Sequence, residues 1–189
     1  VIQLSFSIAF ADDTKTLIVD KANSKIAFIA DAVFVDGKLG YTVEGIFSEY
    51  EGRAQISQTN FADSKIQFKV KIASIKTKAI KVENNLEGAM SSAMGGGIVN
   101  TLASMDSMRD SHLKSADYFD SANFPEASFR SISISPGKSS NEYVLKGKLT
   151  IHGISQTGEF DLKPIKQYQD AQNKKHTVFE AKMQYKLQL

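Results

Sequence analysis

The sequence predicts an all-β protein, an antiparallel sheet of eight strands closed into a barrel, with a short helical segment crossing it. The first observation is strict alternation of apolar and polar residues, clearest over 65–72 and again over 179–189. The second is that turn-forming residues separate these runs, as at Asp20–Ser24 and Pro136-Gly137. The third is that each run has one polar face, which suits a sheet with one side in water. Closure removes the exposed edges of such a sheet, and about eight strands enclose either a packed core or one small ligand.

Composition limits the function classes. The chain has 189 residues, of which 42% are hydrophobic and 23% charged, as expected for one globular domain. The net charge of +2 is nearly balanced, so we expect no nucleic-acid partner. Cysteine is absent, which excludes disulfides and thiol chemistry.

The N-terminus indicates a location. Residues 1–10 are mostly apolar, and Ala9-Phe10-Ala11 precedes two aspartates as a signal-peptidase site would. We interpret residues 1–11 as a signal-peptide remnant and residues 14–189 as the single barrel domain. The alternative is an amphipathic strand, because residues 2–10 also alternate. Since no other stretch approaches the length of a membrane span, we expect a periplasmic or secreted protein without stable membrane insertion.

Residues 81–105 interrupt the strand pattern. Residues 88–105 carry no charge, and apolar side chains recur every four residues at Leu86, Met90, Met94, Ile98 and Leu102. Gly95-Gly96-Gly97 divides this stripe, so we expect two short helices around a flexible joint. Two interpretations stay open: a helical hairpin packed on the barrel, or a mobile lid at a ligand entrance.

The stretch 108–129, called the crossing segment below, separates the two groups of strands. Ser107-x-x-Asp110 fits a capping box, which predicts a helix beginning near Met108. Pro125 should hold Phe124 extended and allow a strand to follow. The aromatic residues of this segment are expected to plug or cap an apolar interior.

Several motifs resemble the YceI-like family of exported lipid-binding proteins. Arg109-Asp110-x-His112-Leu113 with Phe124-Pro125-x-x-x-Phe129 resembles its central signature, and Gly147-x-Leu149-Thr150-Ile151 with Gly153 resembles its second. The resemblance implies a lipocalin-like barrel that holds a polyisoprenoid or other long-chain amphiphile such as a quinone or fatty-acid derivative. It also implies a periplasmic binding protein, in some members induced by stress, and not an enzyme.

Three features depart from the family pattern. Asn23 and Lys38 stand where the family often has histidines. The segment 81–105 resembles an insertion, and the chain ends at Leu189 within a strand pattern, so we expect the native chain to continue. The sequence specifies no cofactor and leaves a homodimer open.

The expected ligand contacts are inward aromatic residues together with the crossing segment: Phe28, Phe47, Phe68, Arg109, His112, Leu113, Phe119, Phe124, Phe129 and Phe179. Arg109 and His112 fit either a ligand headgroup or structural anchoring. Asp110-Ser111-His112 cannot form a catalytic triad, because adjacent helix positions point in different directions. His152 is expected to face solvent, and the three histidines lie too far apart in sequence to specify a metal site.

Two other functions remain open. One is an enzyme acting on a hydrophobic substrate, with His112 as base. The other is a filled barrel that acts through the surface of the insertion.

Overall fold

The computed structural model describes residues 2–11, 16–33, 39–57, 60–82, 98–173 and 175–185, and the side chains of most of them. The described strands, with their bounds, are β1 (Ile2–Ala11), β2 (Thr16–Ile18), β3 (Lys25–Val33), β4 (Leu39–Phe47), β5 (Tyr50–Gln55), β6 (Lys65–Lys71), β7 (Ile75–Val82), β8 (Glu126–Pro136), β9 (Tyr143–Ile151), β10 (Ile154–Gln169) and β11 (Lys175–Tyr185). The helices are α2 (Ile98–Lys114) and the 3₁₀ turns η1 (Phe61–Asp63) and η2 (Ile72–Ser74).

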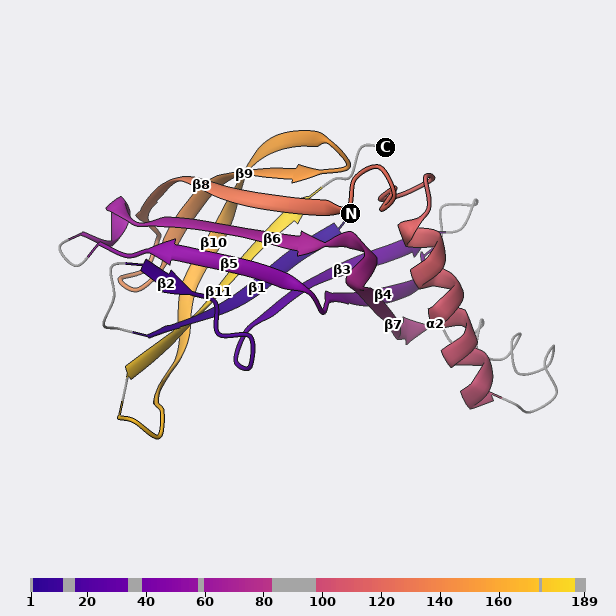
Figure 1. Cartoon of the computed structure of the whole chain (residues 1–189), viewed down its shortest axis with the longest axis horizontal. Coiled ribbons are helices and arrows are strands. Elements are labelled where there is room, and N and C mark those ends of the chain that lie inside the picture. Colours follow the sequence, from indigo (N-terminus) through magenta and orange to yellow (C-terminus); the bar gives the residue numbers. More distant parts are fainter. Residues whose placement is uncertain are drawn as a thin grey trace.

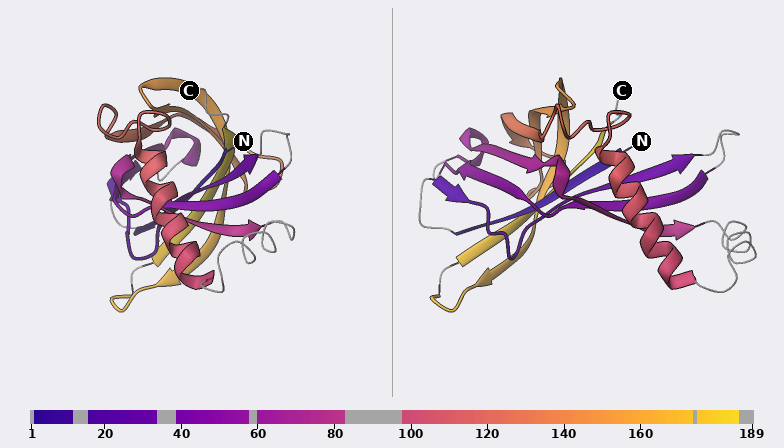
Figure 2. Two further views of the ribbon diagram at one scale, coloured as in Figure 1. Left: turned by 90° about the vertical axis from the view of Figure 1, so that its right-hand side faces the viewer. Right: turned by 45° about the vertical axis from the view of Figure 1, so that its right-hand side comes forward.

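All eleven strands belong to one antiparallel sheet. Their order is β2-β5-β6-β8-β9-β10-β11-β1-β3-β4-β7. The sheet is strongly curled, and α2 crosses one end of it beside β7 (Figures 1 and 2). The antiparallel, mainly β class predicted by the alternation is therefore confirmed.

Three long passes of the chain supply strands to both ends of this sheet. A bend separates β4 from β5, and η2 separates β6 from β7, while residues 19–24 lie between β2 and β3. The two halves of each such pass therefore lie at opposite ends of the strand order, with β2, β5 and β6 at one end and β3, β4 and β7 at the other, which wraps the sheet around a shared interior. The eleven strands lie on eight extended passes, so the predicted number of eight describes passes and not separate strands.

The first of the eight passes is the single strand β1. It lies between β11 and β3, with Phe6 opposite Ala181 on one side and Ile26 on the other. The structure thus contains the amphipathic strand that was the alternative to a signal-peptide remnant. Cleavage after residue 11 remains a prediction.

The helix differs from the prediction. It begins at Ile98 and continues to Lys114, so Ser107 lies inside it and caps nothing. The main-chain oxygen of Ser107 accepts a hydrogen bond from the hydroxyl of Ser111, and the carboxylate of Asp110 binds β7 instead. The expectation of a helix beginning near Met108 was wrong, because tertiary contacts use the residues of the supposed capping box. The glycine joint at 95–97 lies outside the described residues.

The strand after Pro125 begins at Glu126, as predicted. Among the described residues, no helix is both long enough and apolar enough to cross a membrane.

Candidate ligand-binding interior

The interior beside α2 is lined by an aromatic group of three side chains. The ring of Phe28 in β3 lies 5.8 Å from that of Phe47 in β4 and 6.4 Å from that of Phe119 in the crossing segment. These centroid distances are typical of favourable aromatic pairs. All three side chains are at least 94% buried. Phe119 therefore closes the interior from the side of the helix, as the plug prediction requires.

Glycine makes room for Phe28. Gly45 is its direct cross-strand partner, and a Cβ at Gly45 would lie only 2.1 Å from the Phe28 ring. The ring thus covers the bare main chain of β4, and no other residue type fits at position 45 without moving it.

A second aromatic group lies deeper along the sheet. The Phe129 ring in β8 stacks on Phe68 in β6 at 5.1 Å and meets Phe160 in β10 edge-on at 5.0 Å. Gly147 in β9 has the same role here as Gly45 above, since a Cβ on it would lie 2.2 Å from the Phe129 ring.

A small apolar cavity lies among these groups. Its volume is about 30 Å³, and its wall is formed by residues of β3, β4, β6, β8, β9 and β10: Ile26, Ala27, Phe47, Phe68, Val70, Ala127, Ser128, Leu149, Ile151 and Phe160. That volume holds about one water molecule. This cavity is thus small and mainly apolar.

A third aromatic group covers the start of the β6 pass. Phe61 of η1 stacks on Phe179 of β11 at 5.5 Å and contacts Tyr143 of β9 at 4.6 Å. The strands β6 and β7 are the two halves of one pass. The third group lies beside η1, which precedes β6, and the Phe28 group lies beside α2, which packs on β7, so the two groups lie toward opposite ends of this pass. Phe179 is only partly buried.

The crossing segment is held to β7 by polar contacts. The Asp110 carboxylate accepts hydrogen bonds from the main-chain N–H of Thr77 at 2.8 Å and from its hydroxyl at 2.6 Å. Arg109 donates from Nε to the Thr77 hydroxyl oxygen at 3.0 Å and pairs with Asp106. These contacts satisfy the buried Asp110 carboxylate and support the anchoring interpretation of Arg109.

His112 lies on the outer side of the helix. Its side chain is 60% exposed, its Nε2 is 3.9 Å from Asp117, and its ring meets Tyr118 edge-on. Leu113 and Tyr118, in contrast, pack against the core. The structure therefore brings Leu113 and Phe119 to the interior and leaves His112 away from it.

Phe124 packs against the turn between β9 and β10. His152 and Gly153 both have positive φ angles, 51° and 71°, as a two-residue type I′ hairpin requires. The Phe124 ring meets His152 edge-on at 4.6 Å and lies where a Cβ of Gly153 would be, 2.6 Å away. His152 is half-buried under Phe124, so the expectation that it faces solvent was wrong: position 152 begins the turn and no longer follows the strand alternation.

A polar cluster joins β10 and β11 to the turn after β2. The Tyr168 hydroxyl donates to Asp20 at 3.1 Å, and the Tyr168 ring stacks on His176, whose Nε2 lies 2.9 Å from Asp170. The hydrogen bond from the Asn23 side chain holds the pKa of Asp20 below its usual value, and burial raises the pKa of Tyr168. In the part of the chain that the structure describes, no three histidine or acidic side chains converge as metal ligands.

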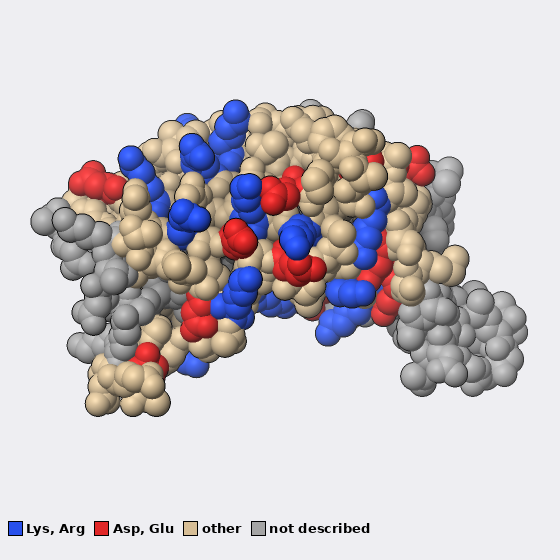
Figure 3. Space-filling model, viewed as in Figure 1, with Lys and Arg blue, Asp and Glu red and all other residues tan. Residues whose placement is uncertain are grey.

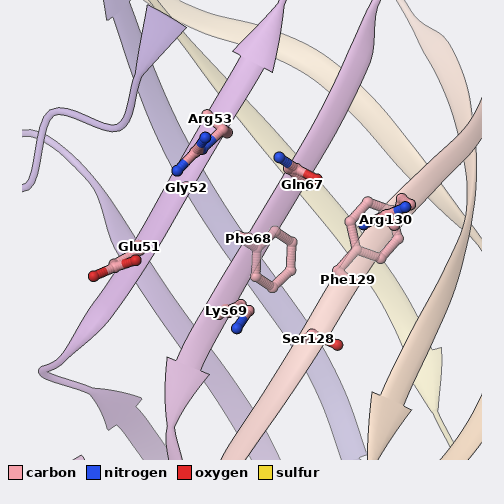
Figure 4. Close-up of a pocket in the computed structure, with 9 residues that line it drawn as sticks. All are labelled: Glu51, Gly52, Arg53, Gln67, Phe68, Lys69, Ser128, Phe129 and Arg130. Atoms are coloured by element: carbon pink, nitrogen blue, oxygen red, sulfur yellow. The ribbon is translucent and has the colours of Figure 1, made fainter.

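The structure also reveals a groove that the sequence interpretation missed. It has a volume of about 410 Å³ and lies across β5, β6 and β8 (Figure 4). Its nine residues form three cross-strand rows, of which the middle one is Gly52, Phe68 and Phe129. Phe68 and Phe129 are buried, so by alternation the two flanking rows point outward: Glu51, Lys69 and Ser128 on one side, and Arg53, Gln67 and Arg130 on the other. The signal that could have found it is basic residues at outward positions of neighbouring strands.

A curled antiparallel sheet around an apolar interior, crossed by a helix, defines a barrel-type binding-protein architecture. The chain belongs to the YceI-like family: the model described as the YceI-like domain matches residues 18–188.

The individual relatives share about 30% sequence identity with this chain or less. The UPF0312 protein plu2095 of Photorhabdus laumondii is 30% identical over 138 residues, which cover 71% of this chain and 57% of that protein. The protein YceI of Escherichia coli O157:H7 is 28% identical over 150 residues, which cover 79% of this chain and 63% of that protein. The chain thus spans about three fifths of the length of the curated relatives it matches.

Two solved structures are also similar. A YceI protein from Campylobacter jejuni superimposes with a TM-score of 0.49 at 20% identity, over 71% of this chain and 63% of that one. The protein BcnA from Burkholderia cenocepacia gives a TM-score of 0.48 at 14% identity, over 96% of both chains.

Proposed function

We propose that the protein binds and carries a long-chain amphiphilic lipid, of the polyisoprenoid kind, in the interior of the curled sheet. The observation that carries this is an apolar interior shared by six strands and closed by Phe119, a side chain from a loop and not from the sheet. Membership of the YceI-like family supports it, as does the motif set of the crossing segment.

The lipid needs more room than the described cavity of about 30 Å³ offers. The side chain that can yield with least disturbance is Phe119, because it belongs to the loop between α2 and β8 and participates in no strand pairing. Exposing one phenylalanine costs about 3 kcal/mol at most, whereas each buried methylene contributes about 0.8 kcal/mol. About four methylenes buried in the space that the ring leaves would therefore already offset its displacement.

In this proposal, Phe28, Phe47, Phe68 and Phe129 form the wall, and Leu113 and Phe119 form the movable end. Phe179 belongs to the aromatic group at the other end of the pass. Arg109 and Phe124 contribute by fixing the crossing segment, since Arg109 binds β7 and Phe124 packs on the β9–β10 turn, whereas His112 lies beside Asp117 and Tyr118 of the same segment. We further propose that the protein acts outside the cytoplasm.

The small cavity favours a second candidate, a filled barrel that acts through its surface. An interior that is already packed gains nothing from a ligand unless its rings move. The exposed position of His112, by contrast, gives no support to an enzyme with that residue as base, because its ring does not face the interior.

Native mass spectrometry of the purified protein tests the proposal. We expect a retained lipid mass, and, after delipidation, uptake of a polyisoprenyl phosphate or quinone in one-to-one ratio. The matched pair of variants is Phe119→Trp, which enlarges the closing side chain, and Phe124→Trp, which enlarges a ring outside the interior. Reduced uptake in the first variant only supports binding behind Phe119. A protein that stays ligand-free after exposure to isoprenoid extracts supports the filled barrel instead.

A further inference from the structure

The outward side chains of β5, β6, β8 and β9 are ordered in cross-strand rows. One row contains Arg53, Gln67, Arg130 and Lys148 from four successive strands. The row beside it contains Lys65 in β6 and Lys146 in β9, the latter opposite Glu159 of β10. Neighbouring strands are about 4.8 Å apart, so these cations form one continuous surface, called the basic face below.

The basic face differs from the other end of the same strands. There Lys69 pairs with Glu126 at 2.8 Å and Lys71 with Glu49 at 2.6 Å, which cancels their charges. In the basic face Arg53, Arg130, Lys148 and Lys65 pair with no carboxylate of the described residues, and the one ion pair is Lys146 with Glu159 at 3.8 Å. Figure 3 shows basic side chains gathered toward one end of this surface, and acidic and basic ones interleaved toward the other.

Two exposed isoleucines border the basic face. Ile18 in β2 is the cross-strand partner of Arg53 and is 78% exposed. Ile132 follows Arg130 by two residues in β8, at the register shift between Ser131 and Ser133, and is 60% exposed. The shift adds one residue to β8 and leaves an aliphatic side chain outside the sheet.

We propose that the basic face docks the protein on an anionic lipid bilayer. Cations without carboxylate partners attract a negative surface, and aliphatic side chains at the border of such a patch enter the interfacial layer. Single-stranded nucleic acid is the less suitable partner, because it needs aromatic platforms on which bases stack, and the exposed residues of these rows include none. The groove of about 410 Å³ is lined by Arg53, Gln67 and Arg130 on one side and by Glu51, Lys69 and Ser128 on the other, and its basic side provides a recess for a phosphate group.

Vesicle flotation tests the proposal without any variant. Wild-type protein should bind vesicles of phosphatidylglycerol and phosphatidylcholine, fail to bind vesicles of phosphatidylcholine alone, and lose binding as salt rises to about 0.5 M. Each basic residue contributes roughly five-fold to the partition coefficient, so Arg53→Gln with Arg130→Gln should weaken binding about 25-fold. Ile18→Ser with Ile132→Ser should weaken binding at low salt and leave the salt dependence of the remaining binding unchanged, because these side chains carry no charge.

The matched control is Lys163→Gln with Lys182→Gln. It removes the same charge from β10 and β11, where both lysines contact Glu180. We expect it to bind anionic vesicles within about two-fold of wild type. Equal binding to neutral and anionic vesicles would overturn the proposal. So would a loss of binding in Lys163→Gln with Lys182→Gln as large as that in Arg53→Gln with Arg130→Gln. Binding of a single-stranded oligonucleotide in preference to anionic vesicles would overturn it in favour of nucleic acid. None of these outcomes depends on whether the interior holds a lipid.

Discussion

Thr77 in β7 and Asp110 in α2 are joined twice, because the main-chain N–H and the hydroxyl of Thr77 both donate to the same carboxylate oxygen. Both residues are 8% exposed. A buried carboxylate is stable only when it is hydrogen-bonded, and Thr77 supplies these bonds at the point where the helix meets the sheet. This pair therefore positions the crossing segment, and with it Phe119.

Removing one partner of this pair should destabilise the protein. Thr77→Val keeps the shape of the side chain but deletes the hydroxyl donor, so the free energy of unfolding should fall by about 2–3 kcal/mol. Asp110→Ala should cost a similar amount. Urea denaturation measures both, and Ser111→Ala, an exposed neighbour, should stay within about 0.5 kcal/mol of wild type. A loss for Thr77→Val no larger than that of Ser111→Ala would contradict the anchoring role.

Shortening Phe119 should loosen the closure of the interior. Phe119→Ala removes a 95% buried ring from contact with Phe28, which should cost about 3 kcal/mol. If a lipid lies behind this ring, its dissociation should also become faster, which stopped-flow fluorescence of a labelled long-chain lipid measures. Phe124→Ala, on the same loop but outside the interior, should leave the dissociation rate unchanged. Equal rates in wild type and Phe119→Ala would place the exit elsewhere.

A methyl group at position 45 should be poorly tolerated. The Cβ in Gly45→Ala would lie 2.1 Å from the Phe28 ring, so the ring must move and about 1–3 kcal/mol of stability should be lost. Phe28→Leu alone should also destabilise, but in its presence Gly45→Ala should cost much less. A double-mutant cycle measures this coupling. Additive effects would show that Phe28 does not cover Gly45.

Acid should weaken the contact between the β2–β3 turn and β10. The pKa of Asp20 is lowered by hydrogen bonds, first from Asn23 and also from Tyr168. A lowered folded-state pKa gives stability that is fully present above the unfolded value of about 3.9 and is lost as the pH falls through the folded value. Asp20→Asn should therefore lower the Tm near neutral pH and make its decrease toward about pH 3 shallower.

The matched control for this pH effect is Asp63→Asn, which removes the same charge from an exposed position in η1. Its Tm curve should run parallel to that of wild type. A curve for Asp20→Asn that is parallel to wild type would contradict the contribution of Asp20.

The sequence predicted the strands well because alternation records which side chains face the interior. Phe28, Phe47, Phe68 and Phe129 are all buried, as their phase required. Alternation does not show, however, where an extended run bends and changes its pairing partners. The bend between β4 and β5 and the turn η2 divide single alternating runs into strands that pair with different neighbours.

The errors have a common cause in contacts between distant residues. Asp110 resembles a capping residue in sequence, but Thr77, 33 positions away, binds its carboxylate. His152 follows a strand pattern, but the hairpin turn and the Phe124 ring decide its environment. The basic face was missed because Arg53, Arg130 and Lys148 come together only through strand pairing.

Photo-crosslinking with a long-chain lipid that carries a diazirine near its terminal methyl group tests the central claim most directly. After irradiation, peptide mass spectrometry identifies the labelled residues. The lipid-carrier proposal predicts label on inward residues of several strands, chiefly Phe28, Phe47, Phe68 and Phe129, and its loss when unlabelled polyisoprenoid competes. Label confined to outward residues, or undiminished by the competitor, would contradict binding in the interior.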